Sequence, residues 1–342
     1  MPNDPLADAP RLLIEAKLQP VQGSRFQPTG FPDLGAATYT LHNNTAMLLV
    51  ESAQSMANRL EAACLDDAGL APHAALAGMP YVEAKLPDGT VTNSLLEAHR
   101  VNSPYLVNAP EFAELEKAIG FEKNKPFDRQ KLARALFKYD PCSLIHGIFL
   151  EKVGGVVRLP RALSSFIEAR NVTAAESGGV KFDRVQPETT GKVTPYGKAE
   201  DGFGNVPYHR SDYCGEITAY FNLDLALIRG FGLPPEAQEF LVTLSLFKMR
   251  RFLETGLRLR TACDLDLKEL TVTRPSGYVL PELPALTTRL GELVAANKTH
   301  FRAEPVLKVN FDTKVAKARK DKGEKEKKAD AVQPLEGDAA ST

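Results

Sequence analysis

The stretch that decides the fold is HGIFLEKVGGVVRLPRALSSFIEARN, which runs from His146 to Asn171. Ile148–Leu150 is an apolar run, and Gly154-Gly155 can supply the positive φ values of a tight hairpin turn. Val156-Val157 resumes a strand, and Pro160 suits the first position of a helix, where its missing N–H is not needed. The stretch therefore predicts two strands joined by a tight turn and followed by a helix that ends near Asn171.

Positive charge marks this stretch and its neighbourhood. Arg129 to Arg184 holds ten Lys and Arg residues against five Asp and Glu residues, although the net charge of the whole chain is −1. Cations that are concentrated in one region attract phosphate groups. A small αβ unit that carries such cations and has no candidate catalytic nucleophile is typical of a polyanion-binding site. A solvated surface is the other interpretation of the same cations.

Composition narrows the class of protein. The 342 residues are 43% hydrophobic and 25% charged, as in an ordinary globular protein. No apolar run reaches the 18 residues of a membrane span, and the N-terminal segment lacks the pattern of a signal peptide. The four cysteines lie far apart without a CxxC pair, which favours reduced thiols over a zinc site. We therefore expect a cytoplasmic protein with no membrane contact, no metal and no cofactor.

Hydrophobic periodicity outlines the rest of the chain. Alternating or continuous apolar residues predict strands, and near-helical spacing predicts helices. The expected strands are Leu12–Leu18, Ser143–Leu150 and Ile217–Ile228, and the expected helices are Ala46–Leu65, Phe127–Lys138, Pro160–Asn171, Pro234–Thr255 and Ala285–Asn297. This order predicts an α+β fold with insertions, compatible with an RNA-recognition-motif (ferredoxin-like) core. Periodicity alone leaves other α+β folds open.

Three segments lie outside this pattern. Pro72–Pro126 has weak periodicity and is expected to be an insertion. Ala174–Tyr208 is rich in glycine, and it could be a linker or a long mobile hairpin. The charged segment from Lys314 lacks bulky apolar residues after Val315 and is expected to be a disordered tail.

Four segments together carry a resemblance to a known family. They are RLLIEAKLQPVQGSRFQPTGFPDLG from Arg11, VESAQSMANRLEA from Val50, RLPRALSSFIEARNV from Arg158 and YHRSDYCGEITAYFNLDLALIRGFGL from Tyr208. In these segments the chain resembles the backbone subunit of type I CRISPR surveillance complexes (Cascade), of the subtype called I-G, formerly I-U. That subunit belongs to the RAMP superfamily, and the similarity runs over roughly residues 10–310.

The resemblance implies an architecture and a mechanism. Residues 10–312 would form one palm with the RNA-recognition-motif fold, with a helical finger insertion at 72–126, a thumb hairpin at 173–208 and the charged tail at 313–342. Copies of such a subunit assemble head to tail along the spacer of a CRISPR RNA and present its bases for pairing with target DNA in antiviral defence. The implied partners are the CRISPR RNA, the target strand, further copies, the large subunit and the subunit that processes and binds a guide end.

The candidate RNA-binding residues are polar or cationic side chains of the palm and thumb, as expected where protein contacts phosphate rather than base edges. They are Lys17, Gln22, Ser24, Arg25, Ser52, Gln54, Ser55, Asn58, Arg59, Arg158, Arg161, Ser164, Arg170, Lys181, Arg184, His209, Arg210, Arg258 and Arg260.

An enzymatic function is the alternative. Some relatives cut RNA with a loop aspartate, for which Asp33, Asp140 and Asp212 could be proposed, and others process the guide without metal using histidine as a general acid–base. His146 and His209 are the candidates for that role. No GxxxxGK[ST], HExxH or GxSxG motif is present, so we expect no catalysis.

Overall fold

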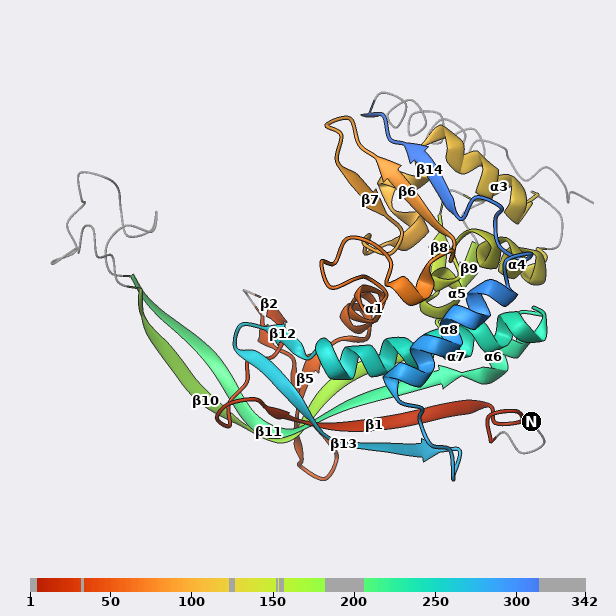
Figure 1. The fold of residues 1–342 in the computed structure, drawn as a ribbon. Helices are drawn as coiled ribbons and strands as arrows, with labels where there is room; N and C mark the ends of the chain where they lie inside the picture. Colours follow the sequence, from red (N-terminus) through yellow and green to blue (C-terminus); the bar gives the residue numbers. More distant parts are fainter. Residues whose placement is uncertain are drawn as a thin grey trace, which may run out of the picture. The chain divides into compact units, whose positions relative to one another are not determined.

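The computed structural model describes residues 5–31, 34–122, 127–151, 153, 157–181 and 206–313 (Figure 1). It is a mixed α+β fold, as predicted. The chain divides into two compact units. Unit 1 comprises Met1–Arg59, Ser164–Asn222 and Met249–Leu280, and unit 2 comprises Leu60–Leu163, Leu223–Lys248 and Pro281–Thr342.

The described part of the chain contains strands and helices of very different lengths. The strands are β1 (Arg11–Pro20), β2 (Gly30–Phe31), β3 (Gly35–Ala36), β4 (Thr38–Thr40), β5 (Ala46–Glu51), β6 (Tyr81–Lys85), β7 (Val91–Asn93), β8 (Ile148–Leu150), β9 (Val157–Leu159), β10 (Leu163–Lys181), β11 (Val206–Asp224), β12 (Arg258–Arg260), β13 (Cys263–Arg274) and β14 (Val306–Asn310). The helices are α1 (Ala53–Ala62), α2 (Pro104–Val107), α3 (Ala113–Ile119), α4 (Arg129–Tyr139), α5 (Cys142–His146), α6 (Leu225–Gly230), α7 (Pro235–Thr255) and α8 (Leu283–Ala296). Short 3-10 helices lie at Ala74–Leu76, Arg100–Asn102 and Pro110–Phe112.

Unit 1 is organised by a seven-stranded sheet in the order β12-β13-β1-β11-β10-β5-β4. Strand β1 pairs antiparallel with β13, and β10 pairs antiparallel with β5 (Figure 1). Buried Leu12, Ile14, Ala16 and Leu18 alternate along β1, because successive side chains of a strand point to opposite faces. This alternation gives the sheet one face that packs into the core of unit 1.

The helix expected from Pro160 to Asn171 is wrong, because this segment begins strand β10. Ser165, Ile167 and Ala169 are buried at every second position, while Arg170 is exposed. Backbone pairing of Ile167–Arg170 with β5 fixes the extended conformation. The strand and hairpin expected before it are confirmed in part, since β8 and β9 pair antiparallel.

Three other expected elements change type along their length. The first part of the expected helix Ala46–Leu65 is strand β5, and α1 begins only after Ser52, whose Oγ accepts a hydrogen bond from Ser55 N at 3.2 Å. The first half of the expected strand Ser143–Leu150 belongs to helix α5, and its last three residues form the short strand β8. The strand expected to reach Ile228 ends at Asp224, which caps α6 by accepting from Leu227 N at 2.7 Å.

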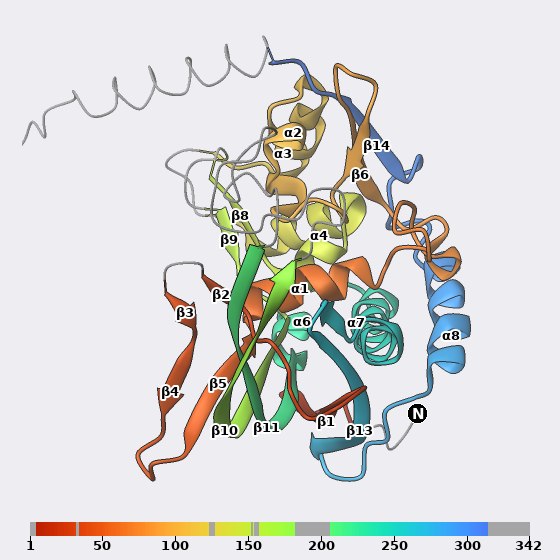
Figure 2. The same cartoon turned by 90° about the vertical axis from the view of Figure 1, so that its left-hand side faces the viewer.

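Unit 2 has a smaller sheet and several helices. Strands β14, β6 and β7 form a three-stranded sheet (Figure 1), and β14 runs parallel to β6 (Figure 2). Phe137, Phe240 and Phe301 form an aromatic cluster with ring centroids 5.2–5.9 Å apart. Phe137 lies on α4 and Phe240 on α7, two helices that the sequence correctly predicts.

The expected finger, thumb and tail stay predictions. Residues 72–122 of the expected finger belong to unit 2 and carry β6, β7, α2 and α3. The expected thumb coincides with the outer parts of the neighbouring strands β10 and β11, and residues 182–205 lie outside the described residues. The tail from residue 314 also lies outside them. Within the described ranges, no helix combines the length and apolar character needed to cross a membrane.

The core of unit 1 depends on an aromatic contact between its sheet and α7. Phe252 is 1% exposed, and its ring meets that of Phe221 edge-on with centroids 6.4 Å apart. We expect Phe252→Ala to lower the free energy of unfolding by about 3–5 kcal/mol, since it leaves a cavity in a packed core. Val279→Ala, at a side chain 81% exposed, should change it by less than about 0.5 kcal/mol. Urea unfolding measures the free energy of unfolding of both variants, and amide hydrogen exchange in β1 follows unit 1 specifically. Equal losses of stability in the two variants would contradict this account of the core.

Candidate nucleic-acid interface

Most of the predicted RNA-binding residues fall in unit 1. Arg158 and Arg161 belong to unit 2, and Arg184 lies outside the described residues. Lys181, His209 and Arg210 lie in strands β10 and β11, but their side chains also lie outside the description. The remaining candidates come from β1 and the loop after it, from α1 and its start, from β10 and from β12.

The loop after β1 presents three of these side chains to solvent. Gln22, Ser24 and Arg25 are exposed, while the neighbouring Phe26 is 1% exposed and anchors the loop. Phe26 exchanges two backbone hydrogen bonds with Tyr213 of β11, each of 2.9 Å. The loop is therefore held on the sheet directly after its exposed residues.

The same loop is also tied to the chain around β12 and β13. Val21 N donates to Asp264 O at 3.0 Å, and Gln27 N donates to Ala262 O at 2.7 Å. These bonds bring exposed Arg25 and exposed Arg258 onto segments that are bound to each other, although 233 positions separate them in the sequence. Unit 1 can thus offer cations from distant parts of the chain on connected segments.

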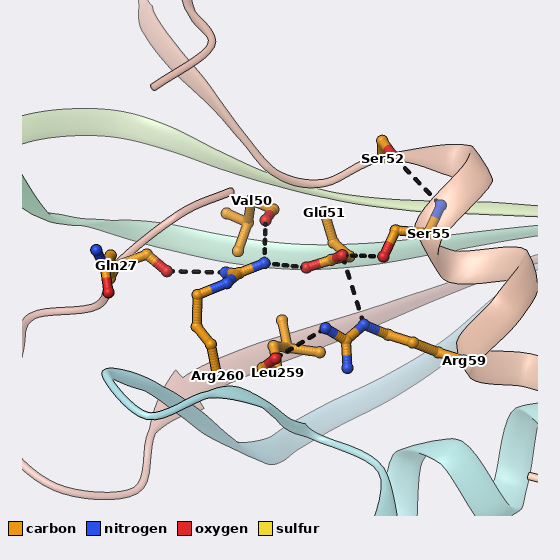
Figure 3. A network of polar contacts seen from close by, with 8 residues as sticks. All are labelled: Gln27, Val50, Glu51, Ser52, Ser55, Arg59, Leu259 and Arg260. Atoms are coloured by element: carbon orange, nitrogen blue, oxygen red, sulfur yellow. Dashed lines mark hydrogen bonds and ion pairs between the residues drawn. The ribbon is translucent and has the colours of Figure 1, made fainter. Parts of the chain in front are cut away.

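A buried carboxylate lies beneath this region. Glu51 ends β5 with its side chain 3% exposed, and it faces two arginines (Figure 3). Arg260 forms a close ion pair with Glu51 Oε2, and Arg59 Nε lies 3.5 Å from Glu51 Oε1. The hydroxyl of Ser55 donates to the same carboxylate. One carboxylate therefore connects β5, α1 and β12.

Both arginines also bind backbone carbonyls. Arg260 donates to Gln27 O at 2.8 Å and to Val50 O at 3.4 Å, and Arg59 donates to Leu259 O at 2.8 Å (Figure 3). Their side chains are only 23% and 27% exposed. We therefore interpret Arg59 and Arg260 as residues that position the loop and β12, while Arg25 and Arg258 are the exposed cations of the region.

Other candidates of unit 1 have mixed surroundings. Lys17 is exposed on β1 but forms an ion pair of 2.8 Å with Glu269 of β13. Arg170 is exposed on β10, and Ser164 on the same strand is half-buried. On α1, Gln54 is exposed and Asn58 is half-buried, and the first turn of the helix holds no acidic residue.

The two candidates of unit 2 lie near the β8–β9 hairpin. Arg158 is exposed, and its guanidinium lies 4.3 Å from the centre of the Phe149 ring, directly opposite on the paired strand. Arg161 is half-buried, and burial together with the charge of Arg100 lowers the pKa of its guanidinium. An exposed cation stacked on an aromatic ring could contact either a phosphate or a base.

The residues considered for catalysis are mostly inaccessible. His146 is 1% exposed, and burial holds the pKa of its ring well below the usual value. Asp140 and Asp212 are also buried, Asp33 lies outside the described residues, and the side chain of His209 is not described. In the described part of the chain, no three His, Cys, Asp or Glu side chains are grouped as metal ligands would be.

Sequence reasoning missed Glu51. The only signal is an acid at the end of the otherwise apolar run AMLLVE, just before the helix-capping Ser52. Its partner Arg260 is 209 residues away, so the pattern could not reveal the ion pair.

The two kinds of carboxylate in unit 1 allow a matched test. Glu51→Gln should lower the free energy of unfolding by about 3 kcal/mol, because it leaves two partly buried guanidinium groups without their counter-charge. Glu269→Gln removes the same charge from the exposed pair with Lys17 and should cost less than about 1 kcal/mol. Urea unfolding compares the two variants. A cost for Glu51→Gln no greater than that for Glu269→Gln would show that the carboxylate does not hold this region together.

Comparison with known proteins adds one family match. No curated protein matches the chain. Two solved structures described as CRISPR RNA-guided surveillance complexes are similar at 14% and 13% identity, cover 84% of this chain and 88% and 82% of theirs, and have TM-scores of 0.42 and 0.39. Csc2 from Thermofilum pendens is similar at 15% identity over 92% of this chain and 76% of its own, with a TM-score of 0.30. Residues 12–174 match the family described as CRISPR-associated protein GSU0053.

Proposed function

We propose that this chain is a non-catalytic backbone subunit of a type I CRISPR effector complex that binds the CRISPR RNA. The observation that carries this proposal is the family match over residues 12–174, because that span contains the loop after β1, strand β5 and helix α1. These elements supply Gln22, Ser24, Arg25 and the candidates of α1, together with Glu51 and Arg59 of the buried ion pairs. Arg258 and Arg260 of β12 lie outside the matched span. The match thus covers part of the segments where unit 1 can offer cations and amides to a phosphate backbone.

The finer assignment rests on the sequence resemblance. We propose subtype I-G, an RNA-recognition-motif palm, a finger and a thumb, with the long strands β10 and β11 leading into the thumb. Copies would assemble head to tail along the guide spacer in the cytoplasm, with the large subunit and the guide-processing subunit at their sides. Pairing between guide and target DNA would then read sequence, while the protein holds the backbone.

Burial of His146 supports a role without catalysis. A general acid–base must lie within hydrogen-bonding reach of the reacting group, and His146 instead contacts the buried ammonium of Lys248 at 2.7 Å. The nuclease alternative would therefore depend on His209.

Copy number tests the backbone role directly. The chain is co-expressed with a CRISPR array and the other subunits of the complex, purified through a tag on another subunit, and weighed by native mass spectrometry. We expect several copies for each guide, and more copies when the spacer is lengthened, because a filament grows with its template. One copy at every spacer length, or trimmed RNA ends that depend on His209, would contradict the proposal.

The exposed arginines can be tested through salt dependence. Arg25→Ala and Arg258→Ala should each weaken guide binding, and the slope of log K against log salt should become shallower by about 0.7 for each phosphate that is no longer neutralised. Arg289→Ala is the control, because it removes the same charge from a half-exposed arginine of α8 that pairs with Glu239 and Glu292. Titration of labelled guide RNA at several salt concentrations measures the slope. An equal change in all three variants would show a general charge effect rather than a specific role of Arg25 and Arg258.

A further inference from the structure

Unit 2 buries a group of side chains that the proposed RNA-binding role does not use. Cys64 follows α1, Cys142 and His146 lie on α5, and Lys248 lies on α7. All four side chains are at most 1% exposed. We call these four residues the thiol cluster.

Lys248 is the centre of the thiol cluster. Its Nζ lies 3.3 Å from Cys142 Sγ and 2.7 Å from His146 Nε2, and it also forms a side-chain hydrogen bond with Cys64. An ammonium group has three N–H donors, and two sulfurs and one imidazole nitrogen account for all three. Because burial keeps the His146 ring neutral by lowering its pKa, Nε2 can accept this bond. One ammonium thus holds both sulfurs beside it.

The buried carboxylates nearby have closer partners of their own. Glu61 forms an ion pair of 2.8 Å with Arg100. Asp140 accepts from Ser143 Oγ at 2.9 Å and from the backbone of Cys142 at 3.2 Å. The hydrogen-bond partners of the Lys248 ammonium are therefore the thiols and the imidazole, while, against the effect of burial, the charges of Cys142, Cys64 and Glu61 all raise its pKa.

The two sulfurs share one ammonium and hydrogen-bond to each other. Although burial opposes this shift, the hydrogen bond between them and the charge of Lys248 lower the pKa of the first thiol to ionise, and the same hydrogen bond together with burial raises the pKa of the second. The pair therefore carries one thiolate and one thiol. A thiolate next to a second thiol is the arrangement of a nucleophilic and a resolving cysteine.

We propose that Cys64 and Cys142 are a reversible oxidation site at which a peroxide converts the two thiols into a disulfide. The thiolate of the pair attacks one peroxide oxygen, the O–O bond breaks, and hydroxide leaves, which gives a sulfenic acid. The sulfur of the other cysteine then attacks the sulfur of the sulfenic acid, its proton joins the departing hydroxyl, and water leaves. In total, two thiols and one hydrogen peroxide give one disulfide and two waters. Since both sulfurs are buried, a small oxidant reaches them through local opening of unit 2.

The test uses the full-length chain and hydrogen peroxide. Reduced protein is treated with peroxide and quenched, and one portion is weighed intact. A second portion is unfolded and alkylated, and its peptides are mapped. We expect the mass to fall by two hydrogen atoms, two fewer cysteines to be alkylated, and one linked peptide pair to contain Cys64 and Cys142. Dithiothreitol should restore the original mass.

Cysteine variants assign the bond. Cys64→Ser and Cys142→Ser should each abolish it, whereas Cys263→Ser should leave it unchanged. Cys263 is the matched control, because it is also buried but its pKa is raised to about 11, mainly by burial. Four alkylatable thiols after treatment, a link to another cysteine, or a gain of oxygen at Cys64 or Cys142 without a link would overturn the proposal. A gain of one oxygen with loss of two hydrogens and a link between Lys248 and Cys142 would overturn it as well.

A lysine variant tests the part played by Lys248. Lys248→Met should slow disulfide formation by on the order of tenfold, since loss of the ammonium raises the thiol pKa and each pKa unit changes the thiolate fraction about tenfold near neutral pH. An unchanged rate in the folded variant would remove Lys248 from the proposal. The peptide map of the unaltered chain decides the oxidation site even where this variant does not fold. None of these readouts involves RNA, so their outcome is separate from that of the proposed function.

Discussion

The ion pairs of Glu51 are the constraint on which the candidate interface depends. A single buried carboxylate faces Arg59 and Arg260, and these arginines in turn bind the carbonyls of Gln27 and Leu259. The end of β5, helix α1, the loop after β1 and strand β12 are thereby fixed to one another. Breaking such a pair is costly because the remaining charges stay partly buried. The exposed side chains on these segments therefore keep a defined spacing, which a phosphate backbone requires of its binding surface.

The local hydrophobic pattern correctly predicted those elements whose buried residues follow the same periodicity in the structure. Strand β1 alternates apolar and polar residues, and α4, α7 and α8 have helical spacing, so each was expected close to its observed bounds. The prediction of a helix after Pro160 was wrong because the leucine, phenylalanine and alanine residues of this segment are compatible with a helix as well as with a strand. Pairing with β5 decided its conformation, and this partner lies more than a hundred residues earlier. Pairing with a distant strand overrides the local secondary-structure propensity, and a short window of sequence does not reveal such pairing.

The candidate site was predictable in composition but not in arrangement. The sequence identified the cations of the loop after β1 and of β12, and the structure places them on segments joined by hydrogen bonds. It could not separate Arg25 and Arg258, which are exposed, from Arg59 and Arg260, which hold the structure together. That distinction depends on Glu51, whose position beside Arg260 arises only when distant strands assemble. Counting lysine and arginine residues in the sequence therefore overestimates the number of cations that are available to bind a partner.

Both units bury cations beside carboxylates, and unit 2 also buries Lys248, whose hydrogen-bond partners are not carboxylates. In unit 1 a carboxylate faces the guanidinium groups, and this ion pair does not change with redox conditions. In unit 2 the hydrogen-bond partners of the Lys248 ammonium are two thiols and an imidazole, so its environment changes if the sulfurs are oxidised. A disulfide carries no charge, and the buried ammonium would then lose its thiolate counter-charge while keeping the full cost of its desolvation. The same physical requirement, a counter-charge for a buried cation, is thus met by carboxylates in both units and, under the proposed oxidation, becomes sensitive to redox conditions at Lys248.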